Sequence, residues 1–225
     1  MIIAIDGPAG SGKSSTAKAV AARLGFTYLD TGAMYRVITL KSLRNAVAAT
    51  DFTSLDVLTK KTLITFTGTP PDIIVWMDGE NVTDAIRSDE VTKNVSDYCA
   101  PLVVREALVE QQRTIAKNVS VVCDGRDIGT VVFRDADLKF FMVASVEERA
   151  RRRMKDFADL GISKSIDELI NDLTVRDNKD STRANSPLFK AEDAEEIDTT
   201  GISFEEQVEY IVSKALFIIG KKNDS

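Results

Sequence analysis

The 225-residue sequence lacks histidine and contains only two cysteines, Cys99 and Cys123. Without an imidazole, the chain cannot carry out Ser-His-Asp hydrolysis or Cys-His proteolysis, and no histidine is present to bind a metal. Two cysteines are also too few for a disulfide framework or a cysteine-based zinc site. We therefore expect both thiols to be reduced side chains that pack in the interior.

The sequence also lacks any apolar run approaching 18 residues, so it predicts no transmembrane helix. Residues 1–5 are apolar, but no basic segment precedes them and Asp6 follows at once, unlike a secretion signal. With 29 basic and 35 acidic residues, the net charge of −6 argues against a general nucleic-acid coat. We expect a cytoplasmic, monomeric protein that binds small molecules and neither nucleic acid nor membranes.

The composition is otherwise that of a globular chain, because 44% of the residues are hydrophobic and 28% are charged. Residues 2–6 form an apolar run that ends at Gly7 and predicts a buried parallel strand. From Ser14, apolar residues recur at helical spacing until Gly25. Further strands are expected at 26–30, 119–124, 138–144 and 197–199. Further helices are expected at 32–47, 101–117, 146–160 and 165–178, and a final one carries an apolar stripe of Phe204, Val208, Ile211, Ala215 and Ile218.

This alternation of strands and helices predicts an α/β fold with a parallel sheet. In such sheets ligands bind at the carboxyl ends of the strands, where Asp6, Asp30 and Asp124 are expected to lie.

A different pattern interrupts the alternation. Residues 62–68 and 73–78 are strand-like and are separated by a proline-containing turn, which predicts a small antiparallel insert over 62–88. Residues 151–190 are rich in arginine and other polar residues and could close over phosphate groups as a lid. We expect a single chain with three parts: this insert, this lid, and a core that comprises residues 1–61, 89–150 and 191–225.

Residues 7–14 match the phosphate-binding pattern G-x-x-x-x-G-K-[ST], between an expected strand and an expected helix. In such a loop the backbone N–H groups point at phosphate, and the following helix adds its positive N-terminal end. We expect Lys13 to reach the β- and γ-phosphates and Ser14 to bind Mg²⁺. The residues expected to hold the nucleotide are Gly7, Pro8, Ala9, Gly10, Ser11, Gly12, Lys13, Ser14 and Ser15.

Arginines are concentrated after the phosphate loop in a chain that is acidic overall. Consecutive residues on a helix point about 100° apart, so residues 151–153, all arginines, cannot all face one ligand. They form either a solvated basic face or, with Arg176 and Arg183, a lid that neutralises a transferring phosphoryl group. A phosphate acceptor suits a chain without histidine, because a phosphate monoester ionises near neutral pH and needs no dedicated base. Asp124 could still act as a base toward a hydroxyl acceptor.

Three segments resemble the bacterial cytidylate kinase family: residues 5–14 (IDGPAGSGKS), 29–36 (LDTGAMYR) and 123–133 (CDGRDIGTVVF). Residues 104–108 and 176–183 are similar to that family too, and the resemblance covers essentially the whole chain. The first segment is common to many nucleotide enzymes, whereas the second and third are much more specific. The resemblance implies a P-loop NTPase-type kinase with a five-stranded parallel sheet. Such a kinase transfers the γ-phosphoryl group of ATP to CMP or dCMP, with Mg²⁺ as cofactor.

The resemblance also implies roles for individual residues. Thr31 would lie near the acceptor, whose phosphate would be held by Arg36 and Arg126. The residues that would read the cytosine edge are Ser96, Arg105 and Asp127. The residues that would contact the acceptor near its sugar are Arg176 and Asp180. The residues with catalytic roles would be Lys13, Arg126, Asp124, Arg153 and Arg183, of which Arg183 would also contact the substrate and Asp124 would act on Mg²⁺ through water.

Each assignment has a simpler alternative. Asp30 could simply cap the helix that follows it, and Asp124 and Asp127 could be turn residues. Arg105 could be a surface charge, and Ser96 could be incidental. The whole chain could also phosphorylate another nucleoside monophosphate such as UMP, or be a nucleotide-dependent ATPase or switch that binds partners.

Overall fold

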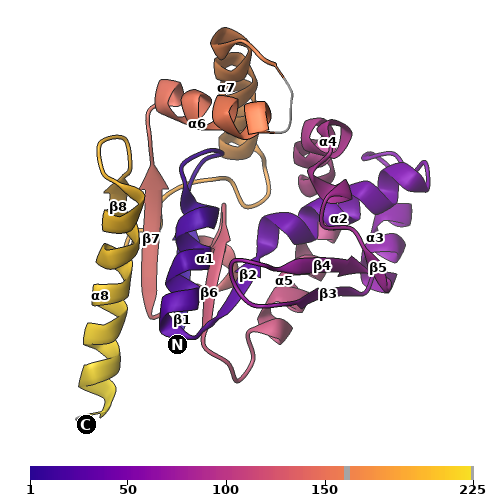
Figure 1. Cartoon of the computed structure of the whole chain (residues 1–225). Helices are drawn as coiled ribbons and strands as arrows, with labels where there is room; N and C mark the ends of the chain where they lie inside the picture. Colours follow the sequence, from indigo (N-terminus) through magenta and orange to yellow (C-terminus); the bar gives the residue numbers. More distant parts are fainter. Residues whose placement is uncertain (160–162, 224–225) are drawn as a thin grey trace.

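A computed structural model describes residues 1–159 and 163–223. The end of an expected helix at residue 160, residues 160–162 of the expected lid and residues 224–225 of the expected core lie outside the described residues. A sheet of five parallel strands forms the centre, in the order β2-β6-β1-β7-β8. The strands are β1 (Ile2–Asp6), β2 (Thr27–Asp30), β6 (Val121–Gly125), β7 (Leu138–Val143) and β8 (Glu195–Asp198). The expected α/β fold with its parallel sheet is confirmed (Figure 1).

Helices cover both faces of the sheet, because its strands direct apolar side chains alternately to two cores. In β1, Ile3 and Ile5 pack with α1 (Lys13–Leu24) and α8 (Phe204–Asn223). Ala4 points to the other face and packs with α2 (Thr31–Arg44) and α5 (Leu102–Ile115). All three side chains are fully buried, as expected for a near-continuous apolar strand inside a parallel sheet.

The register of the central strands brings three carboxylates to one edge of the sheet. Asp124 of β6 pairs with Ile5 of β1 and with Asp30 of β2, and Asp6 pairs with Gly125. The carboxyl ends of these strands are therefore level, and Asp6, Asp30 and Asp124 meet where ligands of such folds bind.

The antiparallel pairing expected within residues 62–88 is confirmed. Strands β3 (Ile64–Thr67), β4 (Ile74–Met77) and β5 (Glu80–Asn81) form a separate antiparallel sheet in that order. A 3₁₀ turn, η1 (Ala85–Arg87), then leads into α4 (Asp89–Cys99). The sequence analysis did not delimit α4, nor α3 (Phe52–Lys61), whose first turn is capped by the Asp51 side chain.

Helices α6 (Val146–Asp159) and α7 (Ile166–Thr182) lie beyond the carboxyl ends of the strands (Figure 1). They pack on each other and on the loop after β1, because Ala150, Leu169 and Leu173 bury Ala9 in a small apolar cluster. Ser165 and Glu168 form a reciprocal capping box that starts α7. Across the described ranges, every helix is too short or too polar to traverse a lipid bilayer.

Several expected boundaries were wrong. Helix α7 continues to Thr182 rather than ending near residue 178, although its last turns are polar. Helix α2 ends at Arg44 rather than at residue 47, since Asn45 and the positive φ of Ala46 (52°) stop it. Phe204 does not join the core face of α8, because 44% of its surface is exposed. A five-residue π-helical turn, η2 (Ile128–Val132), which the sequence analysis did not expect, follows β6.

Candidate active site

The loop between β1 and α1 has the backbone of a phosphate-binding loop. Gly10 and Gly12 adopt left-handed φ values of +78° and +89°, which residues other than glycine rarely adopt. Lys13 is buried, and its Nζ donates to the carbonyl of Pro8 at 3.1 Å. Burial, reinforced by the charge of Arg126, lowers the pKa of Lys13 to about 7. The ammonium group thus lies in a place where an anion would favour its charged form.

Ser14 and Asp124 meet at the base of the loop. The Ser14 hydroxyl donates to Asp124 Oδ2 at 2.6 Å, and the Tyr28 hydroxyl donates to Oδ1 at 2.7 Å. Burial and then the nearby Asp30 carboxylate raise the pKa of Asp124. A hydroxyl beside a carboxylate suits Mg²⁺, which prefers hard oxygen ligands and keeps several waters. Within residues 1–159 and 163–223 no cluster of three or more acidic or cysteine side chains could hold a metal alone. The donor set therefore fits a Mg²⁺ ion that arrives with a nucleotide.

A cavity of about 620 Å³ opens next to the loop, at the carboxyl edge of the sheet. Almost every residue singled out from the sequence lines it. The lining includes Ala9, Gly10, Gly12, Lys13, Ser14, Ser15, Thr31, Arg36, Ser96, Arg105, Asp124, Arg126, Asp127, Arg153, Arg176, Asp180 and Arg183. Gly7, Pro8 and Ser11 belong to the loop but do not line the cavity. One cavity thus joins the phosphate loop to residues from α2, α4, α5, α6 and α7.

The cavity wall carries a buried ion pair. Arg105 Nη2 lies 2.5 Å from Asp127 Oδ2, and their side chains are only 3% and 4% exposed. The Arg105 guanidinium also stacks 5.1 Å from the centre of the Tyr35 ring and donates to the Cys99 carbonyl. The simpler reading of Arg105 as a surface charge is therefore wrong. Asp127 is more than a turn residue, and Ser96 also lines the cavity.

Several arginines line the cavity. Arg126 Nε pairs with Asp180 Oδ2 at 2.9 Å, and Arg36 donates to the carbonyl of Ile86 and the hydroxyl of Thr92. Burial, together with the charges of neighbouring arginines, lowers the pKa of Arg36 to about 10 and that of Arg176 to about 9.

Two of these guanidinium groups have spare hydrogen-bonding capacity. Arg176 Nε and Arg183 Nη2 are buried and have no hydrogen-bond partner among the described residues. Unpaired buried donors of this kind are rare in native proteins. The cavity therefore offers positive charge to an anionic ligand, from side chains whose hydrogen bonding is incomplete.

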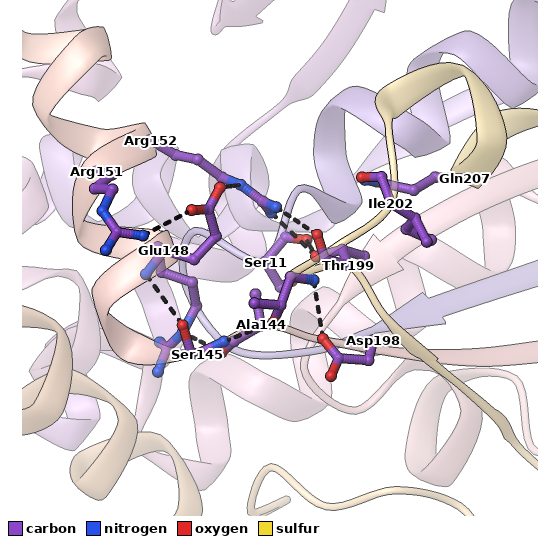
Figure 2. A network of polar contacts seen from close by, with 12 residues as sticks. Ser11, Ala144, Ser145, Glu148, Arg151, Arg152, Asp198, Thr199, Ile202 and Gln207 are labelled. Carbon is purple, nitrogen blue, oxygen red and sulfur yellow. Dashed lines mark hydrogen bonds and ion pairs between the residues drawn. The ribbon is translucent and has the colours of Figure 1, made fainter.

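The three consecutive arginines of α6 diverge, as the helical geometry predicts. Arg151 points to solvent and contacts Glu148, and Arg153 packs over the Phe157 ring at the cavity wall. Arg152 turns toward the residue that follows β8, where it donates twice to Thr199 (Figure 2). Only Arg152 and Arg153 reach the cavity.

Sequence reasoning did not single out Arg87 as part of the site, and it expected Asp6 and Asp30 only as carboxylates at the carboxyl ends of strands. Arg87 of η1 lines the cavity and approaches Asp30 at 3.6 Å, while Asp30 also caps α2 by accepting from the Ala33 N–H. Asp6 accepts from the N–H groups of Ile128 and Gly129, both at 2.8 Å, and burial raises its pKa to about 7. The only sequence signal that could have pointed to Arg87 was its position at the end of the η1 turn.

A parallel sheet, a glycine-rich phosphate loop on its central strand and an arginine-lined cavity at its carboxyl edge together define a P-loop phosphotransferase. A family model described as "Cytidylate kinase" matches residues 3–216. The chain belongs to the cytidylate kinase family.

Curated relatives agree with this family over nearly the full length. A cytidylate kinase of Streptococcus agalactiae is 50% identical over 98% of both chains, and one of Listeria innocua is 50% identical over 95% of both. A cytidylate kinase of Lysinibacillus sphaericus is 48% identical over 95% of both chains. Among solved structures, an uncharacterized protein from Eubacterium ventriosum superposes with a TM-score of 0.53 at 12% identity, covering 95% of this chain and 97% of that one. That likeness concerns the fold alone.

Proposed function

We propose that this kinase transfers the γ-phosphoryl group of ATP to CMP or dCMP, giving ADP and CDP or dCDP. The observation that carries the proposal is the shared cavity. The phosphate loop, the Arg105–Asp127 pair and several further arginines line this one cavity. A triphosphate bound at the loop and a nucleoside monophosphate bound at the pair would therefore share it.

On the donor side, the loop amides and Lys13 bind the phosphates of ATP. A bound phosphate raises the lowered pKa of Lys13 again, so that its ammonium is charged when ATP is present. Ser14 and Asp124 would hold Mg²⁺, Ser14 directly and Asp124 through water, and the ion when bound neutralises charge on the β- and γ-phosphates.

On the acceptor side, Arg105, Asp127 and Ser96 read the base. Cytosine presents an amino group that donates, next to ring and carbonyl acceptors. A carboxylate accepts only and a guanidinium donates only, so Asp127 and Arg105 match that edge in opposite senses. Uracil has a carbonyl oxygen in place of the amino group, and that oxygen would face the Asp127 carboxylate. The pair therefore favours CMP over UMP.

Phosphate groups are aligned and neutralised by arginines in this proposal. Arg36 and Arg126 hold the acceptor phosphate, Arg176 and Asp180 contact the acceptor near its sugar, and Arg153 and Arg183 stabilise the transferring group. A CMP phosphate is largely ionised near neutral pH, with a second pKa of about 6, so it attacks without a protein base. The chain needs to supply alignment and positive charge, which arginine provides.

Closure of the enzyme belongs to the same proposal. Water must be kept from the γ-phosphate, so we expect residues from about 155 to 190 and the insert at 62–88 to move when the substrates bind. We further expect a cytoplasmic monomer that needs no nucleic acid or membrane.

A coupled assay of ADP formation tests the proposal with ATP–Mg²⁺ and a panel of CMP, dCMP, UMP, AMP and dTMP. We expect turnover with CMP and dCMP to exceed that with the other acceptors. A preference for AMP, dTMP or UMP would contradict the proposed acceptor. Steady ATP hydrolysis that no monophosphate accelerates would instead indicate an ATPase or switch.

A further inference from the structure

The phosphate loop is held from outside by a residue of the sheet edge. Thr199, fully buried directly after β8, places its hydroxyl 3.0 Å from the carbonyl oxygens of both Ser11 and Val143, so its one proton is shared between the loop and β7. Arg152 of α6 donates to both the hydroxyl and the carbonyl of Thr199, at 3.0 and 2.7 Å (Figure 2). The Thr199 N–H also donates to the Val143 carbonyl of β7 at 2.8 Å. Thr199 is therefore fixed in place while it holds Ser11.

A second carbonyl of the loop is held in the same way. Arg149 of α6, which is 7% exposed, donates from Nη1 to the Ala9 carbonyl at 3.1 Å. Its Nε donates to the Ala144 carbonyl, and its Nη1 pairs with Asp177 of α7 at 2.6 Å. Arg149, Arg152 and Thr199, which we call the outer clamp, thus fix the carbonyls of Ala9 and Ser11.

The two carbonyls alternate with the two left-handed glycines of the loop. Glycine tolerates many backbone conformations, so the peptide groups beside Gly10 and Gly12 could rotate at little cost. A trans peptide is planar, and its C=O and N–H groups point in opposite directions. A clamp that fixes the Ala9 and Ser11 carbonyls outward therefore directs the N–H groups of Gly10 and Gly12 the other way. Gly10 and Gly12 line the cavity, whereas Ser11 does not.

We propose that the outer clamp orients the Gly10 and Gly12 N–H groups for the triphosphate before it binds, and that Thr199 is a positioning residue for ATP. The inference rests on the proposed function in that ATP is taken as the ligand of the loop. Binding sites that are already ordered lose less freedom on association. Thr199 and Arg149, which do not line the cavity, therefore increase affinity without touching the ligand. The clamp increases the affinity for the polyphosphate part of ATP and leaves the affinity for the base and for CMP unchanged.

The test compares Thr199→Val, which keeps the shape and removes the hydroxyl, with Thr199→Ser, which keeps the hydroxyl. Thr59→Val is the matched control: Thr59 is fully buried on α3, and its hydroxyl has no hydrogen-bond partner among the described residues. Dissociation constants are measured by titration calorimetry for ATP, inorganic triphosphate and CMP. Thermal unfolding of each variant is recorded in parallel.

We expect Thr199→Val to weaken binding of both ATP and inorganic triphosphate about tenfold, the effect of one lost hydrogen bond. CMP binding stays within about twofold in every variant, and Thr199→Ser and Thr59→Val bind ATP like the wild type. A folded Thr199→Val protein with unchanged ATP affinity overturns the proposal. Weaker ATP binding with unchanged triphosphate binding also overturns it, because Thr199 would then act on the nucleoside.

Arg149→Lys provides an independent test of the outer clamp if Thr199→Val does not fold. A lysine cannot reach the Ala9 and Ala144 carbonyls together with Asp177, so ATP and triphosphate binding should weaken while CMP binding does not. Unchanged triphosphate binding in this variant counts against the clamp. A wild-type protein that binds neither ATP nor triphosphate would instead refute the proposed function itself.

Discussion

The Ser14 hydroxyl and the Asp124 carboxylate, which are 110 residues apart in sequence, lie 2.6 Å from each other at the base of the phosphate loop. The contact joins the start of α1 to the end of β6, and the Tyr28 hydroxyl holds the second oxygen of the same carboxylate at 2.7 Å. These two hydrogen bonds give Asp124 a single orientation toward the cavity.

Replacing Asp124 by asparagine should therefore impair the metal-dependent step. We expect Asp124→Asn to lower kcat about 100-fold and to raise the Mg²⁺ concentration needed for half-maximal rate, because a neutral amide attracts the ion less. Initial rates over a Mg²⁺ titration measure both effects. An unchanged Mg²⁺ dependence would exclude Asp124 from the metal site. Tyr28→Phe, which removes only the supporting hydroxyl, should have a much smaller effect.

Lys13 is expected to be needed for turnover. Lys13→Ala removes the buried cation beside the loop, and we expect kcat to fall about 10²–10³-fold. Steady-state kinetics with saturating ATP and CMP provide the measurement. A kcat near that of the wild type would mean that this loop does not hold the transferring triphosphate. Lys18→Ala, on the same helix but outside the cavity lining, serves as the control.

Arg126 should affect the acceptor more than the donor. Arg126→Ala removes a charged hydrogen-bond donor, and we expect KM for CMP to rise about 10–100-fold while KM for ATP changes about twofold or less. The control is Arg44→Ala, which removes an exposed arginine paired with Glu80 away from the cavity. Equal increases in both KM values would show that Arg126 does not belong to the acceptor side.

Asp127 should determine which pyrimidine is accepted. Asp127→Asn replaces an acceptor by a group that can also donate, so the uracil carbonyl no longer meets a negative charge. We expect the ratio of kcat/KM for CMP over UMP to fall about 10–100-fold. Asp193→Asn, a surface carboxylate that pairs with Lys139, is the matched control. An unchanged ratio would place base recognition elsewhere.

Asp6 should make stability depend on pH. Burial raises its pKa from 3.8 to about 7, so the folded chain holds a proton on Asp6 between these values and the unfolded chain does not. The contribution of this proton to the free energy of unfolding is complete below pH 4 and is lost as the pH rises through about 7. Relative to Asp6→Asn, the wild type should lose on the order of 1–4 kcal/mol between pH 5 and pH 8. Urea unfolding at both pH values measures the difference, and parallel curves would rule out this titration.

Contiguous features of the site could be predicted from the sequence. Residues 7–14 form a pattern whose spacing itself encodes a loop, and Asp30 precedes a helix that it caps. Roles that depend on distant partners came only from the resemblance: Arg105 and Asp127 are 22 residues apart, and helical periodicity alone left Arg105 as a surface charge.

Contacts across the whole chain could not be predicted. Thr199 reaches Ser11 over 188 residues and Asp6 reaches Ile128 over 122, and neither carries a local pattern. The polar end of α7 was expected to be a loop because its apolar periodicity stops. Tertiary contacts such as Asp180 with Arg126 support its last turns instead. Phe204 shows the opposite error, because a stripe at helical spacing included one side chain that the fold leaves exposed.

The Arg126–Asp180 pair has a consequence for what may enter the cavity. The cationic hollow carries its own counter-ion, so a small inorganic anion must displace a carboxylate that is already well placed. A nucleotide brings a sugar and a base as well as a phosphate, and those groups can compensate for the exchange. The Arg126–Asp180 pair would thus favour the binding of complete nucleotides over the binding of free phosphate.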